Sequence, residues 1–408
     1  MASKKTRNDA DDLRGAARLA VDATKAVTDL VEEMHHTIGG GPDVLGRPLS
    51  LPVRLLNAPV YGSIRAVTKL VGVTLDAALS RLAPLLEERT PGPEREAIRA
   101  ALNGVLGDYL SETGNPLAIE MHMYLDGHVL ELDRGESSLP LLPANGKVLV
   151  LVHGSSMNHL QWNRQGHDHG AVLARDLGYT AVYLHYNSGL HISTNGRALA
   201  ELLERVAAVW PVPLEELVLM GHSMGGLVAR SACHYGDLAK HAWRSKLRSL
   251  ICLGSPHHGA PLERGGNWID VLLGVSRYSA ALGRLGRIRS CGVTDLRFGN
   301  VLDEHWEGRD RFLRGKDLRT PLALPADVAC YAVAGTSAPA GAVKLPGDGL
   351  VPVDSALGRH TDPERTLAFP EEHQSIAYGT RHLDLLHRAE VYATLAAWLA
   401  PSDGRRGS

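Results

Sequence analysis

Residues 216–226 read ELVLMGHSMGG, and this stretch decides the fold. The run ELVLM is typical of a buried strand, and GLVARSACHYG, which begins at Gly226, has the spacing of a helix. Between them, Ser223 is the centre of a Gly-x-Ser-x-Gly pattern, which is weak by itself but specific at a strand-to-helix turn. The strain of such a turn exposes the serine hydroxyl at the carboxyl end of the strand, where ligands bind. We therefore predict that Ser223 is a nucleophile.

Other apolar runs alternate with helical segments from residue 116 onward. This alternation is typical of an α/β fold with a mostly parallel sheet flanked by helices. An opening hairpin is expected around residues 126–127, and a last helix over about residues 385–399. The other predicted strands are KVLVLVHG, TAVYLHY, LRSLICLGSPHHG, VACYAVAGT and RTLAFP, which begin at Lys147, Thr180, Leu247, Val328 and Arg365.

The chain is expected to have two parts, an N-terminal helical region over residues 1–115 and an α/β domain over residues 116–402. In the first part, apolar residues recur at helical spacing between clusters of glycine and proline. In the second part, the series of strands stops over about residues 261–325, which predicts a cap or lid above the sheet. The N-terminal helices are expected to pack on the main domain or a partner chain, or to contact a lipid surface.

The composition excludes several classes of protein. Of the 408 residues, 44% are hydrophobic, which is enough for a sizeable core, and the net charge of -2 gives no bulk attraction to nucleic acid. The four cysteines are too widely spaced for a metal motif or a disulfide framework. The opening MASKKTRNDADDLRG lacks the apolar segment of a secretory signal, and no apolar run approaches the roughly 20 residues of a membrane span. We expect a cytoplasmic protein, with peripheral membrane association left open.

A serine nucleophile needs a base, and the base needs an orienting carboxylate. Around this kind of elbow, the acid and then the base follow the serine in the chain. Asp348, flanked by two glycines after the strand that follows the cap, is the expected acid, and Asp354 is its rival. His382, in a loop directly before the last helix, is the expected base. His373 is the second choice, and His387 is expected inside the helix.

The oxyanion of acyl transfer needs preorganised backbone N–H donors. We expect one donor at Met224, directly after the nucleophile, and the other at Ser155, in the loop after the strand that begins at Lys147. The residues expected to contact a substrate lie in that loop, at the elbow and after neighbouring strands; they are His153, Gly154, His159, His222, His257 and His258.

Together these motifs resemble those of bacterial triacylglycerol lipases and of the PGAP1-like esterases, within the α/β-hydrolase superfamily. The resemblance covers about residues 147–400, and it implies a triad of Ser223, Asp348 and His382, a mobile lid and ester hydrolysis. The chain departs from the secreted lipases in its long N-terminal helical region and its lack of a signal segment. The shared motifs are HG at 153–154, GHSMGG at 221–226, GSPHHG at 254–259, GDG at 347–349 and HLD at 382–384.

We therefore expect a serine hydrolase that cleaves carboxylic esters of a lipid-like kind through an acyl-enzyme intermediate. The alternatives are an acyltransferase or thioesterase with the same triad, and an inactive scaffold that binds a lipid or a partner. No cofactor is expected. A metal site is not expected either, because the histidines at 167, 169, 257 and 258 have no further ligands at suitable spacing.

Overall fold

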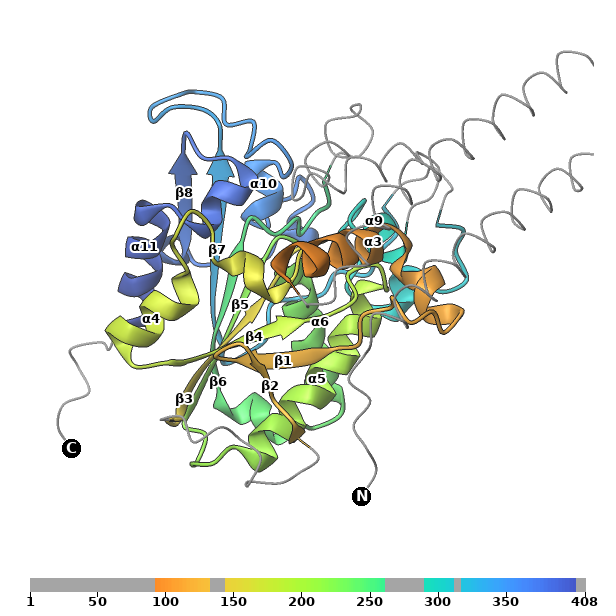
Figure 1. Cartoon of the computed structure of the whole chain (residues 1–408). Coiled ribbons are helices and arrows are strands. Elements are labelled where there is room, and N and C mark those ends of the chain that lie inside the picture. The colour runs from red at the N-terminus through yellow and green to blue at the C-terminus, as the bar shows by residue number, and fades with distance from the viewer. Residues whose placement is uncertain (1–91, 133–143, 261–289, 312–316, 401–408) are drawn as a thin grey trace, which may run out of the picture.

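The computed structural model of the chain describes residues 92–132, 144–260, 290–311 and 317–400. These residues form a mostly parallel sheet with helices on both faces, so the predicted α/β-hydrolase fold class is confirmed (Figure 1). The helical segments predicted before residue 92, and the parts of the predicted cap over residues 261–289 and 312–316, lie outside the described residues.

The sheet has eight strands in the order β2-β1-β4-β3-β5-β6-β7-β8. Strands β1 and β2 form the predicted hairpin, and β1 is antiparallel to β4. Because β3 to β8 run parallel, their carboxyl ends lie at one edge of the sheet, and each predicted site segment follows one of these strands. The strands are β1 His122–Leu125, β2 His128–Val129, β3 Lys147–Val152, β4 Thr180–His185, β5 Glu216–His222, β6 Leu247–Leu253, β7 Ala329–Thr336 and β8 Gln374–Tyr378.

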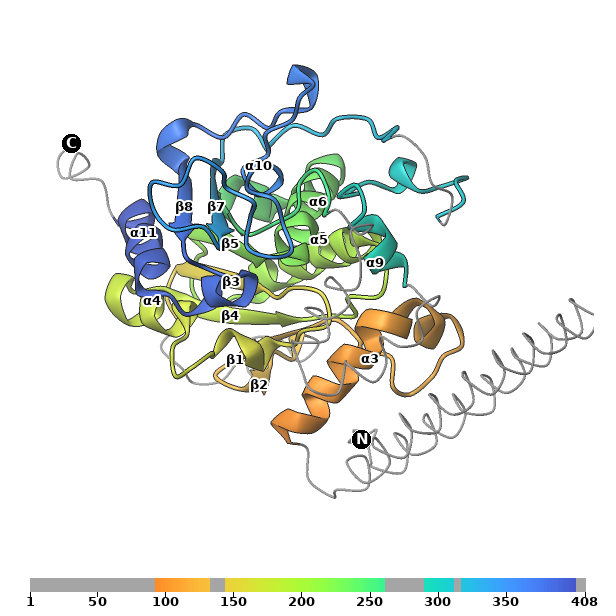
Figure 2. The same ribbon diagram turned by 90° about the horizontal axis from the view of Figure 1, so that it is seen from above.

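Strand β3 shows how the core is divided between the two faces of the sheet. Its buried side chains alternate between two apolar clusters, with Val150 in one and Leu149 and Leu151 in the other. The first cluster lies against α5 and α6 and the second against α4 and α11, on opposite faces (Figure 2). A strand buried on both faces is a continuous apolar run, which is why the sequence marks it.

The helices that cover the sheet differ in length. In the described part of the chain, none is both long and apolar enough to cross a bilayer. The helices are α3 Pro93–Glu112, α4 His169–Leu177, α5 Ile192–Val209, α6 Met224–Leu238, α9 Cys291–Asp295, α10 Val353–Ala356 and α11 Ala389–Leu399.

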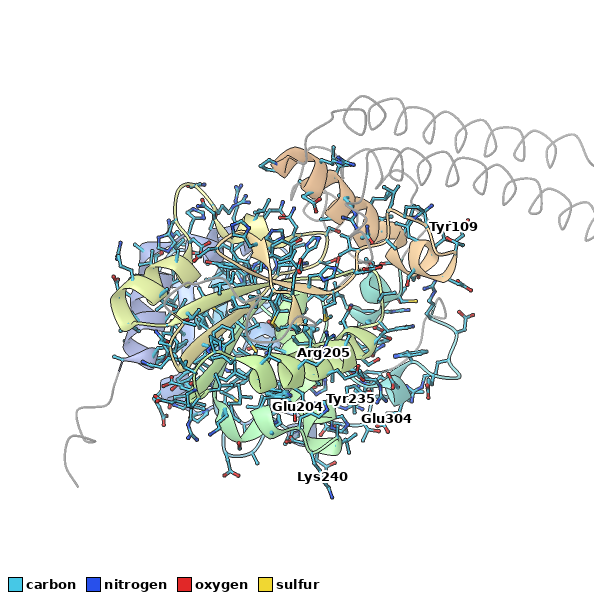
Figure 3. All side chains as sticks on the ribbon, turned by 60° about the horizontal axis from the view of Figure 1, so that its bottom comes forward. Tyr109, Glu204, Arg205, Tyr235, Lys240 and Glu304 are labelled. Carbon is cyan, nitrogen blue, oxygen red and sulfur yellow. The ribbon has the colours of Figure 1, made fainter. Side chains whose placement is uncertain are left out.

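The chain between β6 and β7 returns over α5 and α6. The Asp303 N–H donates to Tyr235 Oη on α6 at 3.0 Å, and Figure 3 shows Tyr235 beside the segment that carries Glu304. Trp306 Nε1 donates to Ser193 Oγ on α5 at 2.9 Å. Residues 290–311, the longer of the two described parts of the predicted cap, are thus tied to these two helices, and their assignment to a cap stays a prediction.

Helix α3 lies across the loops that follow β3 and β4 (Figure 1). Two glycines allow the contact, because a Cβ at Gly104 would be 1.9 Å from Ser156 Oγ and one at Gly107 would be 1.8 Å from Asn187 Oδ1. Asn187 Nδ2 also donates to the Gly107 carbonyl at 2.8 Å. The described end of the predicted N-terminal region therefore packs directly on loops at the carboxyl edge of the sheet.

The strand predicted from Arg365 is wrong, because the eighth strand is β8, further along the chain. In the preceding loop, Leu367 and Phe369 are buried, and their N–H groups donate to the carbonyls of Gly358 and Leu367 rather than to a neighbouring strand. Pro370 has no N–H to offer a strand. The apolar run therefore fills the core without joining the sheet.

The last helix, α11, begins later than predicted. Residues His382–Leu386 form a separate 3-10 helix, η9, in which Asp384 Oδ2 accepts a hydrogen bond of 3.0 Å from the Arg381 N–H. Arg388 is extended, with φ -70° and ψ 132°, which separates the two helices. His387 consequently lies at the end of η9, and the prediction that it lies inside the last helix is wrong.

Candidate active site

Ser223 lies between β5 and α6 in a backbone conformation that few residues adopt. Its φ is 54° and its ψ is -124°, which is unfavourable for any residue except glycine. The turn is held by its main chain, since the Ser223 N–H donates to the Leu253 carbonyl at the end of β6 at 2.8 Å. The serine is partly exposed between two buried neighbours, His222 and Met224. This is the elbow that the sequence predicted.

The glycines of the elbow have no room for a side chain. A Cβ at Gly225 would be 2.1 Å from the Val152 carbonyl oxygen, and one at Gly221 would be 2.3 Å from the Gly226 nitrogen. A Cβ at Gly226 would be 2.0 Å from Ser255 Oγ. The turn therefore packs against the ends of β3 and β6, which brings Ser223 next to the loops that follow both strands.

The expected acid and base lie against each other. His382 Nδ1 donates to Asp348 Oδ2 at 2.7 Å, and both side chains are almost fully buried. The other carboxylate oxygen, Asp348 Oδ1, accepts from the N–H groups of Leu350 and Val351 at 2.9 and 2.8 Å. The carboxylate is thus fixed by three hydrogen bonds, and within the described residues His382 Nε2 has no hydrogen-bond partner.

The rival residues lie elsewhere. The Asp354 side chain is 76% exposed and forms an ion pair of 4.0 Å with Arg359. His373 Nδ1 donates to the Cys330 carbonyl at 3.2 Å, and its ring packs on Tyr331. His387 lies beyond η9. Among these carboxylates and imidazoles, only Asp348 and His382 form a pair in the described part of the chain.

Gly254 links the turn at Ser223 to this pair. It directly follows Leu253, whose carbonyl holds the Ser223 N–H. A Cβ at Gly254 would be 3.2 Å from Asp348 Oδ2 and 3.3 Å from His382 Cε1. The end of β6 therefore touches the elbow on one side and the Asp348–His382 pair on the other.

The two expected oxyanion donors are also at this edge. No hydrogen bond from the N–H of Met224 or of Ser155 is found among the described residues. Met224 opens α6, so its N–H is one of those that a helix leaves without a partner. A Cβ at Gly154, the residue before Ser155, would lie 3.1 Å from Ser223 Cβ. The two N–H groups are therefore available to a bound group beside Ser223.

His153 stabilises the start of the loop that follows β3. Its Nδ1 donates to the Gly154 carbonyl at 2.8 Å, and its ring stacks on Tyr186 with the centroids 4.3 Å apart. Tyr186 Oη donates in turn to the His153 carbonyl at 2.8 Å. Burial lowers the pKa of His153 to about 3, so the ring is neutral and acts as a fixed donor. These contacts hold the start of the loop that follows β3, over residues 153–156.

The other residues expected at a substrate site have varied surroundings. His159 stacks on Tyr124 with the ring centroids 3.7 Å apart. His257 Nδ1 lies 3.2 Å from an Arg230 nitrogen, and His258 Nε2 donates to the Gly358 carbonyl at 3.0 Å. His222 Nε2 lies 3.1 Å from the His382 carbonyl. Of these four, His222 alone contacts one of Ser223, Asp348 and His382 in the described part of the chain, and substrate contact for all four stays a prediction.

The sequence did not predict the contacts that hold Ser156, in the loop after β3, from other segments of the chain. Ser156 has a φ of 60°, and its N–H donates to Ser188 Oγ at 2.9 Å. Gly104 of α3 lies against the Ser156 side chain. Nothing in the sequence pattern marks these contacts, because the three residues come from separate segments. A serine at a left-handed position leaves no periodic signal.

A metal centre has no support in the described residues, where no group of three or more His, Cys, Asp and Glu side chains could hold an ion. His167 and His169 do lie together, with His167 Nε2 2.8 Å from His169 Nδ1. They bond to each other and to the Leu385 carbonyl rather than converging on a common point.

Ser223 and the expected oxyanion donors lie within the part of the chain that contains the parallel strands β3 to β6. Residues 143–319 match the family model described as the PGAP1-like alpha/beta domain. The PGAP1-like match includes Ser223, Ser155 and Met224 and ends before Asp348 and His382. The resemblance that the motifs predicted is thus confirmed over this stretch.

Solved structures of lipases are similar to the chain at low identity. Bacillus licheniformis lipase BlEst2 in its mature form is 18% identical, with a TM-score of 0.40, over 64% of this chain and 94% of that one. Staphylococcus hyicus lipase is 14% identical, with a TM-score of 0.36, over 64% and 97%. Aspergillus fumigatus lipase B is 14% identical, with a TM-score of 0.38, over 62% of this chain and 53% of its own. No curated protein sequence matched the chain.

Proposed function

We propose that the protein is a serine hydrolase that cleaves carboxylic esters of a lipid-like kind. The observation that carries the proposal is the buried Asp348–His382 pair, with a Nδ1–Oδ2 distance of 2.7 Å, which lies against the same end of β6 that holds the strained Ser223. A buried carboxylate and an imidazole have this relation when the ring acts as a base through its other nitrogen. An ordinary turn has no reason to hold a serine at a φ of 54° beside such a pair.

The proposed reaction has two steps. His382 Nε2 takes the proton of Ser223 Oγ as the oxygen attacks the ester carbonyl, and the same proton then passes to the departing alcohol. The N–H groups of Met224 and Ser155 hold the oxyanion of each tetrahedral intermediate. In the second step, His382 takes a proton from water, the hydroxide attacks the acyl-enzyme, and Ser223 leaves with that proton. Asp348 holds the ring in the required tautomer throughout.

The test is hydrolysis of p-nitrophenyl esters that range from acetate to palmitate, with Ser223→Ala as the control. We expect turnover that favours long acyl chains and disappears in the variant. A preference for acetate or butyrate would retain the hydrolase and replace the lipid-like substrate with a small ester. Retained turnover in Ser223→Ala would overturn the proposal, because the activity would then come from another residue or another protein.

Covalent labelling complements the kinetic test. A serine-reactive alkyl phosphonate should form one adduct on the wild-type chain, at Ser223, and none on Ser223→Ala. Water and an added alcohol can then be compared as acceptors from a p-nitrophenyl ester. An ester product that outruns free acid at low alcohol concentration would replace the hydrolase with an acyltransferase, and an unlabelled wild-type protein would favour a scaffold.

A further inference from the structure

Two histidines far apart in the sequence donate to the backbone of the same short helix. His222 Nε2 lies 3.1 Å from the His382 carbonyl, and His169 Nε2 lies 2.9 Å from the Leu385 carbonyl. Both carbonyls belong to η9, the 3-10 helix of five residues that begins with His382. A carbonyl oxygen can only accept, so each ring carries its hydrogen on Nε2.

We infer that His222 and His169 are positioning residues, which hold η9 and thereby place the His382 ring between Ser223 and Asp348. The inference rests on the proposed function, because that function makes His382 the base. A single 3-10 turn has few hydrogen bonds of its own and needs tertiary contacts to stay in place. The two histidines supply such contacts from β5 and from α4, near the two ends of η9.

His222 reaches η9 from the elbow itself. It is the last residue of β5 and precedes Ser223, and it is almost fully buried. Its ring centroid lies 4.7 Å from that of His382. Burial keeps the pKa of His222 well below its usual value, so the ring is a neutral donor. One residue therefore links the main chain of the nucleophile to the main chain of the base.

His169 contacts η9 at a different residue, Leu385. It is the first residue of α4 and is fully buried, and burial lowers its pKa to about 4. Because its Nε2 donates to Leu385, its Nδ1 must accept, and the partner is His167 Nε2 at 2.8 Å. The neighbouring His167 thus fixes the tautomer that His169 needs. The inference thus gives a role to His167 and His169, which the proposed triad does not include.

Substitution by glutamine or by asparagine distinguishes a positioning role of these histidines from a packing role. The glutamine amide nitrogen matches the place of histidine Nε2, whereas the shorter asparagine places its amide near Nδ1 and does not reach the carbonyl. The test therefore compares His222→Gln with His222→Asn and His169→Gln with His169→Asn. The matched control is His305, which is buried and donates from Nε2 to the Thr320 carbonyl at 3.0 Å, away from the triad.

We expect each asparagine variant of His222 and His169 to lower kcat by about 10- to 100-fold, with KM changed by less than about twofold, because a small displacement of the base slows the reaction. The glutamine variants should recover most of the loss. His305→Asn should lower stability without changing kcat. Equal kcat for the Asn and Gln variants at both positions would overturn the inference, as would an equal loss in His305→Asn.

A second readout does not depend on turnover. The proton between His382 Nδ1 and Asp348 should give a strongly deshielded ¹H NMR signal, which Asp348→Asn removes. We expect this signal to shift or broaden in His222→Asn and His169→Asn and to stay in place in the glutamine variants and in His305→Asn. If the wild type hydrolyses no ester, the proposed function fails, and this signal alone decides the positioning: unchanged signals in both asparagine variants would refute it. If His222→Asn does not fold, His169→Asn, on another element, carries the same test.

Discussion

Asp348 and His382 are joined twice, once through their side chains and once through their main chains. Besides the bond from His382 Nδ1 to Asp348 Oδ2 at 2.7 Å, the His382 N–H donates to the Asp348 carbonyl at 3.0 Å. The loops after β7 and β8 are therefore held together even without the carboxylate. This double link allows the chemistry of the side-chain bond to be changed while the loops stay in place.

Asp348→Asn should lower kcat by about 10³- to 10⁴-fold, because an amide nitrogen facing His382 favours the wrong tautomer of the ring. The amide oxygen can still accept from Leu350 and Val351, so the melting temperature should change little. The measurement is ester hydrolysis with thermal unfolding on the same samples. Asp354→Asn is the control, since Asp354 is exposed, and a larger loss in that variant would reassign the acid.

The strain at Ser223 should appear as a difference between two inactive variants. Both Ser223→Ala and Ser223→Gly lose the hydroxyl, but only glycine accepts a φ of 54° with a ψ of -124° freely. Relief of about 1–3 kcal/mol of strain, less the extra entropy of unfolded glycine, should make the glycine variant more stable by about 1 kcal/mol. Urea unfolding measures this difference.

At an ordinary helical position, the alanine variant should be more stable than the glycine variant, which is the opposite of the order expected at Ser223. Glu201 is exposed on α5, so Glu201→Ala should be more stable than Glu201→Gly. If alanine were the more stable residue at both positions, the elbow would not be strained.

The contact between Gly226 and Ser255 predicts a rescue. Gly226→Ala would place a Cβ 2.0 Å from Ser255 Oγ and 2.9 Å from its Cβ, and should destabilise the fold by about 1–3 kcal/mol. Adding Ser255→Gly should recover part of the loss, and adding Ser255→Ala should recover less, because the alanine Cβ remains in the way. A double-mutant cycle from urea unfolding measures the coupling, and purely additive effects would refute the contact.

Acid should destabilise the folded chain through its buried neutral histidines. Burial lowers the pKa of His159, His169 and His305 to about 4 each, whereas histidine in the unfolded chain titrates near 6.5. The unfolded state therefore binds protons first, so the stability is full above about pH 6.5 and falls as the pH drops toward about 4.

A single substitution isolates one of these contributions. His305→Gln should remove up to about 3 kcal/mol of this fall, at roughly 1.4 kcal/mol for each pKa unit. The measurement is urea unfolding of both proteins across this pH range. If the free energy of unfolding had the same pH dependence in both proteins, His305 would not be buried in its neutral state.

The parts of the site that the sequence predicted are marked by patterns within short stretches of the chain. Strands buried on both faces are continuous apolar runs, and the glycines around Ser223 and Asp348 mark tight turns. The strand at β8 was misplaced because Leu367 and Phe369 bury an apolar run in the core from a loop. The hydrogen bonds of His222 and His169 to η9 span 160 and 216 residues, and no pattern along the chain encodes such pairings.

The packing of α3 on the loops after β3 and β4, through Gly104 and Gly107, has a consequence for how the protein unfolds. Asn103 adds to it, because its side chain donates to the Leu117 carbonyl at 2.8 Å and accepts from the Ile119 N–H at 2.9 Å. Loss of α3 would leave the buried Asn187 amide without the Gly107 carbonyl that now receives it. We therefore expect helix and sheet to unfold as one cooperative unit, with the backbone amides of α3 and β4 becoming exchangeable with solvent at the same denaturant concentration.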